Sequence, residues 1–276
     1  MTMSRIAGAT LPAQKTRKDD HTYHPIVIES TTARLYGKTV PGEAPMRVLT
    51  LAAALAAGLW CAPAPAADVP TPANYGQAMR WYDRAAEAGH VRAQFYLGLM
   101  LETGVRGPVD VTAAAAWYRQ AARQGHVQAQ YKLGLLHYEG RGVPRDLARA
   151  ALWYGKAAQG GSAPAQYNLA LMYERGRGVA ANAARAARWY EKAAENGVGA
   201  ARLNLSALYA RGTGVRKDPV RALMWLDLAV AGGLDVEPDV RDGLTVGMSP
   251  GQIEDAGRRA RERLGETAPA AGGALP

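Results

Sequence analysis

The sequence has little of what several classes of protein require. Cys61 is the only cysteine among 276 residues, so an intramolecular disulfide framework is excluded. Phe95 is the only phenylalanine, and five of the six tryptophans fall between Trp81 and Trp225. The apolar run from Val48 to Trp60 is shorter than the roughly 20 residues that a membrane-spanning helix needs. We therefore expect no transmembrane span.

Positive charge is present, but it is not arranged for nucleic acid. The formal net charge is +9, and after residue 67 the chain has 26 Lys and Arg against 20 Asp and Glu. No run of basic residues is interleaved with aromatic residues, as a nucleic-acid groove requires. We therefore expect no nucleic-acid partner.

Residues 46–67 have the three parts of a secretory signal. Met46 and Arg47 give a short basic start, the apolar run follows, and small residues at A-x-A spacing come before Asp68. The pattern predicts secretion, with cleavage after Ala66 or Ala67. A buried apolar helix is the alternative, but the Pro and Ala residues that follow at once argue against it.

Residues 1–45 are polar and do not fit in front of such a signal. We expect Met46 to be the true start and 1–45 to be a misread upstream segment; the alternative is a disordered tail. Cys61 is a poor lipidation site, because the bulky Trp60 precedes it where lipoprotein signals have a small residue.

A repeat of 36 residues fills the middle of the chain. The blocks 78–110, 114–146, 150–182 and 186–218 align without gaps, and a half block follows at 222–233. Two columns are uniform through all five: Trp81, Trp117, Trp153, Trp189 and Trp225, and Gly89, Gly125, Gly161, Gly197 and Gly233. A fixed period of this length is typical of stacked supersecondary units.

Each repeat is predicted to contain two helices. Across 110–124 the apolar residues recur at helical spacing, and Ala129, Leu133 and Leu136 do so in the next segment. Side chains suited to the N-cap precede the first helix of each block, at Asp110, Asp146, Asn182 and Asp218. Gly125 and Gly140 stand where left-handed backbone ends a helix.

Small residues predict where neighbouring helices approach closely. One column reads Gly98, Gly134, Ala170 and Ser206, and a pair of alanines follows each Trp-Tyr. We expect the Trp and Tyr side chains to fill the wider gaps between units. Because a lone helical hairpin cannot cover its own apolar face, stability is expected to come from stacking.

The order W-Y-x-x-A-A-x-x-G, A-x-x-x-L-G and G-x-G-V-x-x-D resembles that of Sel1-like repeats, relatives of the tetratricopeptide repeat. The resemblance covers residues 74–233, with one departure at Arg106-Gly107-Pro108, where the pattern has Gly-Val. It implies an all-α fold, a right-handed α-solenoid of stacked helix-turn-helix units, that serves as a scaffold for protein–protein interaction in the bacterial envelope.

The resemblance also implies a concave face made by residues 91–103, 127–139, 163–175 and 199–211. Two columns on these helices vary between units, whereas the packing columns beside them do not, and recognition residues are free to vary in this way. The predicted partner-binding groove therefore contains Tyr96, Lys132, Glu139, Asn168, Arg175, Asn204 and Arg211. A plain solvated face is the alternative.

No catalytic constellation stands out. Ser162, Ser206 and Ser249 each have a structural role in the pattern, and none lies in a G-x-S-x-G motif. His90 and His126 occupy equivalent turn positions on stacked units, too far apart to share a metal ion. We expect both to be exposed.

Three further side chains bear on catalysis. His137 shares a column with Leu101, Tyr173 and Tyr209, which favours packing. We expect Glu139 and Glu174 to be solvated charges, although a carboxylate pair for glycoside hydrolysis stays open. The sequence thus predicts no enzyme, cofactor or metal site.

The C-terminal end is predicted to close the array. Ser249-Pro250-Gly251-Gln252 has the form of a capping box and starts a charged helix over 249–264. The repeat domain then spans 68–248, and residues 265–276 form a disordered tail.

Three functions are compatible with these patterns. The first is a secreted, periplasmic and monomeric scaffold that binds a protein or peptide and acts as a regulator or assembly factor. The second is a cell-wall glycan-binding or glycan-processing protein, which an aromatic groove would favour. The third is a cytoplasmic adaptor starting at Met1, which an uncleaved N-terminus would reveal.

Overall fold

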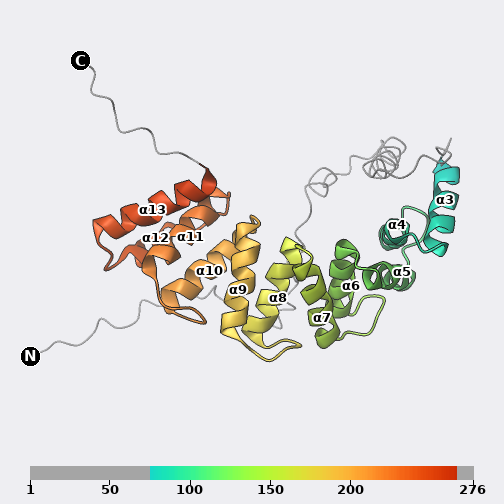
Figure 1. Cartoon of the computed structure of the whole chain (residues 1–276), viewed down its shortest axis with the longest axis horizontal. Helices are drawn as coiled ribbons and strands as arrows, with labels where there is room; N and C mark the ends of the chain where they lie inside the picture. The colour runs from blue at the N-terminus through green and yellow to red at the C-terminus, as the bar shows by residue number, and fades with distance from the viewer. Residues whose placement is uncertain (1–74, 266–276) are drawn as a thin grey trace, which may run out of the picture. The chain divides into compact units, whose positions relative to one another are not determined.

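The structure is a computed structural model that describes residues 75–265, and in that part every regular element is an α-helix (Figure 1). The helices are α3 (Tyr75–Glu87), α4 (Val91–Thr103), α5 (Val111–Arg123), α6 (Val127–Glu139), α7 (Leu147–Gln159), α8 (Ala163–Arg175), α9 (Ala183–Glu195), α10 (Gly199–Arg211), α11 (Pro219–Ala231), α12 (Pro238–Thr245) and α13 (Pro250–Leu264). None of them is long and apolar enough to cross a membrane. The predicted signal, the segment before it and the tail from residue 266 lie outside the described residues.

The described chain divides into two compact units, which adjoin at Gly160 and Gly161. The first unit contains α3 to α7, and the second contains α8 to α13. Within each unit, helices that are consecutive in sequence pack side by side from α3 to α7 and from α8 to α12, as Figure 1 shows, whereas α13 packs against α11. The predicted fold class, an all-α array of stacked helix pairs, is confirmed, and α4, α6, α8 and α10 have the predicted bounds.

The predicted N-caps are confirmed. Each of the four side chains accepts a hydrogen bond from the backbone N–H three residues further on, at 2.8 Å for Asp110 and 2.9 Å for Asp146, Asn182 and Asp218. Each such cap contributes about 1 kcal/mol to helix stability. The predicted helix stops are also confirmed, since Gly125 has a φ of 88° and Gly140 a φ of 75°, both in the left-handed region.

The column of small residues does bring helices close together. A Cβ at Gly98 would lie 2.8 Å from the ring of Tyr118, and one at Gly134 would lie 2.7 Å from the ring of Tyr154. The hydroxyl of Ser206, also buried, donates a hydrogen bond to the carbonyl oxygen of Ala222 at 2.7 Å. These contacts fix how closely the two helices of a pair approach.

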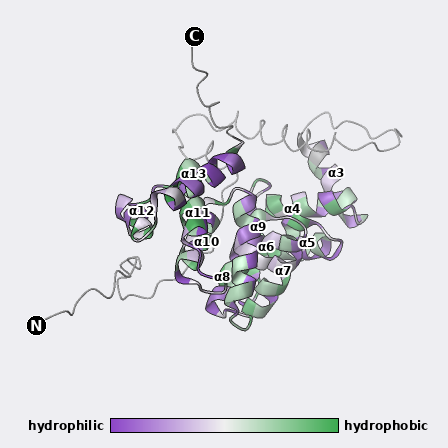
Figure 2. Ribbon diagram, turned by 60° about the vertical axis from the view of Figure 1, so that its left-hand side comes forward, coloured by the Kyte–Doolittle hydropathy of each residue, from purple (hydrophilic) through white to green (hydrophobic). Residues whose placement is uncertain are grey.

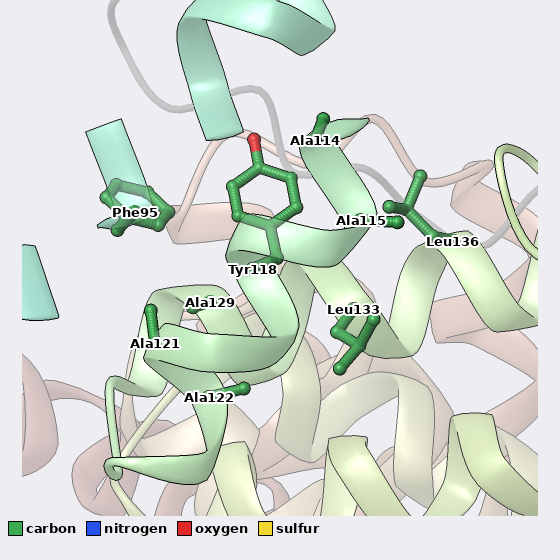
Figure 3. Packing of buried hydrophobic residues seen from close by; sticks show 9 residues of the cluster. All are labelled: Phe95, Ala114, Ala115, Tyr118, Ala121, Ala122, Ala129, Leu133 and Leu136. Atoms are coloured by element: carbon green, nitrogen blue, oxygen red, sulfur yellow. The ribbon is translucent and has the colours of Figure 1, made fainter. Parts of the chain in front are cut away.

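A buried cluster around Tyr118 shows how the first unit is filled (Figure 3). Alanines at two turns of α5 leave room for the tyrosine ring, and leucines of α6 close the other side. Its members are Phe95, Ala114, Ala115, Tyr118, Ala121, Ala122, Ala129, Leu133 and Leu136. An aromatic ring between alanines reaches the dense packing that protein interiors require.

Three of the repeat tryptophans are less buried than we predicted. Tyr118, Tyr154 and Tyr190 are fully buried, but Trp117, Trp153 and Trp189, one position earlier in each helix, are only partly buried. Adjacent helix positions point about 100° apart, so one member of each Trp-Tyr pair turns toward the rim. Lysines lie over two of these partly buried rings: Lys156 Nζ is 4.5 Å from the centre of the Trp153 ring, and Lys192 Nζ is 4.7 Å from that of Trp189.

The predicted C-terminal helix closes the second unit. Ser249 and Gln252 form both hydrogen bonds of the capping box, at 3.3 and 2.8 Å. Only Ala256 and Ala260 of α13 are buried, on the side that packs against α11, and its last turns are hydrophilic (Figure 2). The short helix α12 was not predicted, and none of its residues is buried.

Candidate partner-binding surfaces

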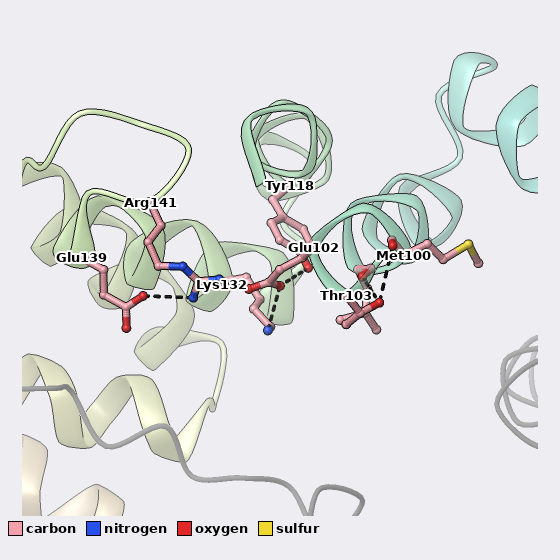
Figure 4. Close-up of polar contacts among 8 residues, drawn as sticks. Met100, Glu102, Thr103, Tyr118, Lys132, Glu139 and Arg141 are labelled. Atoms are coloured by element: carbon pink, nitrogen blue, oxygen red, sulfur yellow. Dashed lines mark hydrogen bonds and ion pairs between the residues drawn. The ribbon is translucent and has the colours of Figure 1, made fainter. Parts of the chain in front are cut away.

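The first unit contains a group of charged side chains centred on a nearly buried carboxylate. Glu102, at the end of α4, has only 8% of its side chain exposed. Its Oε2 accepts hydrogen bonds from the Tyr118 hydroxyl at 2.7 Å and from Lys132 Nζ at 2.9 Å. Arg141 Nη2 lies 4.0 Å from the other carboxylate oxygen (Figure 4). These four residues are called the Glu102 cluster below.

The cluster depends on helix stacking, because its members come from α4, α5, α6 and the loop after α6. Transfer of a carboxylate out of water is costly unless cations and donors compensate for the lost hydration. Lys132 and Arg141 supply the charge, and Tyr118 supplies a neutral donor. Burial, followed by the charge of Glu102, raises the pKa of Tyr118 far above its usual value of 10.0, so its hydroxyl stays protonated and keeps donating.

The second unit repeats part of this arrangement at an interval of two repeats. The Tyr190 hydroxyl donates to Glu174 Oε2 at 2.6 Å, and the Asn204 side chain is hydrogen-bonded to Tyr190. Burial and the nearby Glu174 raise the pKa of Tyr190 as they do for its counterpart. These three residues are called the Glu174 cluster. Glu174 itself is exposed, as we expected for a solvated charge, whereas Glu139, for which we expected the same, has only 16% of its side chain exposed.

Three predicted groove residues lie in the first unit. Tyr96 is partly buried, and its ring packs against Tyr82 at 6.0 Å and against Phe95 at 5.5 Å. Lys132 belongs to the Glu102 cluster. Glu139 Oε2 lies 3.2 Å from Arg141 Nη1, which joins Glu139 to that cluster (Figure 4). Two of the three are thus brought together.

The other four lie in the second unit. Arg175 and Arg211 are exposed in the last turns of α8 and α10, and Asn204 is half-buried in the Glu174 cluster. We expected Asn168 to lie on the surface, but it is only 3% exposed. Its Oδ1 and Nδ2 have no hydrogen-bond partner among the described residues.

Sequence reasoning missed two features. Glu102 lies one residue before the position that is equivalent to Glu139, Arg175 and Arg211 of the later repeats. Only Tyr118, sixteen residues later, would have pointed to it. A second column holds Gln94 and Gln130, which are buried and donate to the carbonyl oxygens of Ala86 at 3.2 Å and Ala122 at 3.1 Å. These glutamines bind the C-terminal end of the preceding helix, so they stabilise the fold.

The histidines differ from one another. His90 is exposed, as predicted, but His126 is not: its ring stacks on Phe95 at 4.6 Å, and its Nδ1 accepts a hydrogen bond from the Ala129 N–H at 3.2 Å. Burial, with a smaller contribution from Arg92, lowers its pKa below 6.5. His137 is 3% exposed, which confirms its predicted packing role.

Neither cluster has the form of a metal centre. Within residues 75–265, no three His, Cys, Asp or Glu side chains are grouped so that they would hold a metal ion. The Glu102 cluster offers carboxylate, ammonium and guanidinium groups, and the Glu174 cluster offers a carboxylate and an amide. Such groups form charge-assisted hydrogen bonds with complementary groups of another molecule.

Comparison with known proteins gives a consistent result. The model of the Sel1 repeat family matches residues 68–90, 91–126, 127–162, 163–198 and 199–234. The crystal structure of a Sel1 repeat protein from Oxalobacter formigenes is similar over 80% of this chain and 88% of that one, with 31% identity and a TM-score of 0.59. A protective antigen of uropathogenic Escherichia coli with an SLR fold is similar over 84% of this chain and 58% of that one, with 25% identity and a TM-score of 0.46. Among curated proteins there is no match.

Proposed function

Because this chain belongs to the Sel1 repeat family, we propose that it is a secreted scaffold that binds a partner protein or peptide in the periplasm. There it acts as a regulator or an assembly factor of the cell envelope. Sel1 repeats are typically non-enzymatic scaffolds for protein–protein interaction, and stacked repeats offer an extended surface for that purpose. The envelope location is supported by the signal-like pattern of residues 46–67.

One observation supports a binding role most strongly: the packing columns are uniform, and the neighbouring polar columns are not. Leu133 and its repeat equivalents Leu169 and Leu205 are all buried. In the same helices Glu139 is replaced by Arg175 one repeat later and by Arg211 two repeats later. A fold that needed only to stack would have no reason to vary charge at fixed positions, whereas recognition of one irregular partner would.

The proposal is tested by crosslinking and capture of the full-length protein from intact cells. The test variant carries Glu139→Ala, Arg175→Ala, Asn204→Ala and Arg211→Ala. Asn168 and Lys132 are left unchanged, because one is buried and the other compensates for a buried charge. The matched control carries Glu87→Ala, Arg119→Ala, Gln159→Ala and Arg188→Ala, at exposed positions of α3, α5, α7 and α9. It removes the same charges and one side-chain amide, a glutamine in place of the asparagine.

We expect the wild type and the control to capture one discrete envelope protein and the test variant, still folded by circular dichroism, to lose it. Capture of the same protein by all three forms would contradict the proposed surface while leaving a scaffold role in place. Capture of glycan, with no protein, would contradict the proposal itself. N-terminal sequencing of the mature protein checks the proposed cleavage after Ala66 or Ala67.

A further inference from the structure

In the first unit, the exposed sides of α3, α5 and α7 carry mostly positive charge. All six basic side chains of these helices are exposed: Arg80, Arg84, Arg119, Arg123, Arg149 and Lys156. The acidic residues of the same helices are Asp83 and Glu87, both on α3. The two basic residues of each helix are four or seven positions apart, so they lie on one side of it. This surface is called the basic face below.

Ion pairs within the chain neutralise little of this charge. Arg149 pairs with the N-cap of its own helix at 3.1 Å. Asp83 accepts a hydrogen bond at 2.8 Å from Arg106, which lies in the loop after α4. Among the described residues, no ion pair forms at Arg80, Arg84, Arg119, Arg123 or Lys156. Five cations therefore remain against two unpaired carboxylates, those of Glu87 and of the N-cap Asp110.

An exposed leucine stands within this positive charge. Leu152 of α7 is 56% exposed, and it lies three positions after Arg149 and four before Lys156, on the same side of the helix. Lys156 Nζ also lies over the ring of Trp153. The repeat equivalents of Trp153 on α3 and α5 are likewise only partly buried. The basic face therefore presents unpaired cations together with an exposed apolar side chain and partly exposed indole rings.

The equivalent helix of the second unit lacks this combination. On α9, Glu191 and Glu195 accompany three basic residues, and Arg188 stands at the repeat position of Leu152. Trp189 has a lysine over its ring, as Trp153 has, so that contact is common to both units. The unbalanced charge and the exposed leucine are what distinguish α3, α5 and α7 from α9.

We propose that the basic face docks on the surface of an anionic phospholipid bilayer. The negative potential of such a surface attracts Lys and Arg side chains, and Trp and Leu side chains favour its interfacial layer. The phosphates of a nucleic acid would also attract the arginines, but they would leave Leu152 in water. Lipid headgroups move within the membrane plane, so they can meet charges spread over three helices without a fixed complementary shape. The inference rests on the proposed envelope location.

The chain offers a matched pair of triple variants for the test. The face variant removes three unpaired cations and carries Arg80→Gln, Arg84→Gln and Arg123→Gln. The control variant removes three exposed cations of α9 and carries Arg185→Gln, Arg188→Gln and Lys192→Gln. Both variants have the same net charge, so a difference between them reports where the charge lies. Circular dichroism checks that both are folded.

Binding is measured by flotation of the full-length protein, as cells process it, with vesicles of phosphatidylcholine alone and of phosphatidylcholine mixed with phosphatidylglycerol. We expect the wild type to bind the mixed vesicles only. The face variant should bind them about a hundredfold more weakly, which is the combined effect of three cations at such a surface. The control variant should bind as the wild type does. Leu152→Ser, which changes no charge, should bind about tenfold more weakly.

Three results would overturn the inference. They are no flotation with the mixed vesicles, equal binding by the face and control variants, and binding by Leu152→Ser as tight as by the wild type. The last result would leave charge alone and favour a nucleic acid or an acidic protein. If vesicles do not bind but the capture experiment still yields an envelope protein, the lipid surface is wrong and the scaffold stands. Vesicle binding without any captured protein would have the opposite meaning.

Discussion

The two units contain the same tyrosine–glutamate hydrogen bond in different electrostatic settings. In the first, Glu102 is 8% exposed and is accompanied by Lys132 and Arg141. In the second, Glu174 is exposed, and Asn204 and Thr213 stand at the repeat positions of the two cations. The same position in the repeat thus holds a nearly buried carboxylate where two cations are nearby and an exposed carboxylate where neutral residues replace both cations.

The largest difference in stability between the two units is expected when Lys132, the cation that binds Glu102, is removed. Lys132→Ala leaves Glu102 nearly buried with only Arg141 at 4.0 Å, and it should destabilise the first unit by about 2 to 3 kcal/mol, below the usual cost of breaking a buried pair. Asn204→Ala should cost less than about 1 kcal/mol, because it removes one hydrogen bond between neutral groups, Asn204 and Tyr190, and leaves no buried charge without a partner. Urea unfolding of both variants measures the two values. Equal losses would contradict the contrast.

Neutralising the carboxylate should rescue the first of these variants. Glu102→Gln in the Lys132→Ala background removes the uncompensated charge, so the double variant should be more stable than Lys132→Ala by about 1 to 2 kcal/mol. Glu174→Gln should have almost no such effect in the Asn204→Ala background. The two double-mutant cycles measure both couplings by urea unfolding. A coupling near zero in the first cycle would mean that Lys132 acts through packing alone.

Removal of the tyrosine hydroxyl should produce a smaller difference in stability between the two clusters. Tyr118→Phe takes a donor at 2.7 Å from a carboxylate that water barely reaches and should cost about 1 to 2 kcal/mol. Tyr190→Phe should cost less than about 1 kcal/mol, because water replaces the hydroxyl at the exposed Glu174. Thermal unfolding checks the order, and a larger loss for Tyr190→Phe would reverse the interpretation.

Acid should weaken the first unit through His126, whose repeat equivalent in the second unit is the non-titrating N-cap Ser162. The folded-state pKa of His126 is lowered, so its contribution to stability is complete above pH 6.5 and is lost as the pH falls below that value toward the folded pKa. His126→Ser keeps a cap and removes the titration. Unfolding at pH 8 and pH 5 should show a smaller acid loss for the variant; an equal loss would assign the effect to other groups, His137 among them.

The sequence was sufficient to predict whatever repeats locally. Helix bounds and the four N-caps depend on residues a few positions apart, and the period aligned them. The column of small residues that begins at Gly98 could be predicted because it recurs at the same period, although its contacts join different helices. Contacts between helices were harder to predict. The ion pair between Glu102 and Lys132 joins α4 to α6, and the sequence around either residue does not predict it.

The misjudged tryptophans and Asn168 have the same origin. The repeat showed that the positions of Trp117 and Asn168 matter, but rotation about the helix axis decides whether such a side chain turns into the stack or toward its rim. The packing of α13 against α11 follows no repeat, because residues 250–264 lie outside the repeated blocks.

The scaffold function is tested most directly by a photocrosslinking residue placed at position 211 in intact cells, with position 188 as the control. Both are exposed arginines of the second unit, one on α10 among the varying columns and one on α9. We predict a discrete protein adduct from position 211 and none from position 188. Adducts from position 188 alone, or from neither position, would contradict a partner bound along these columns.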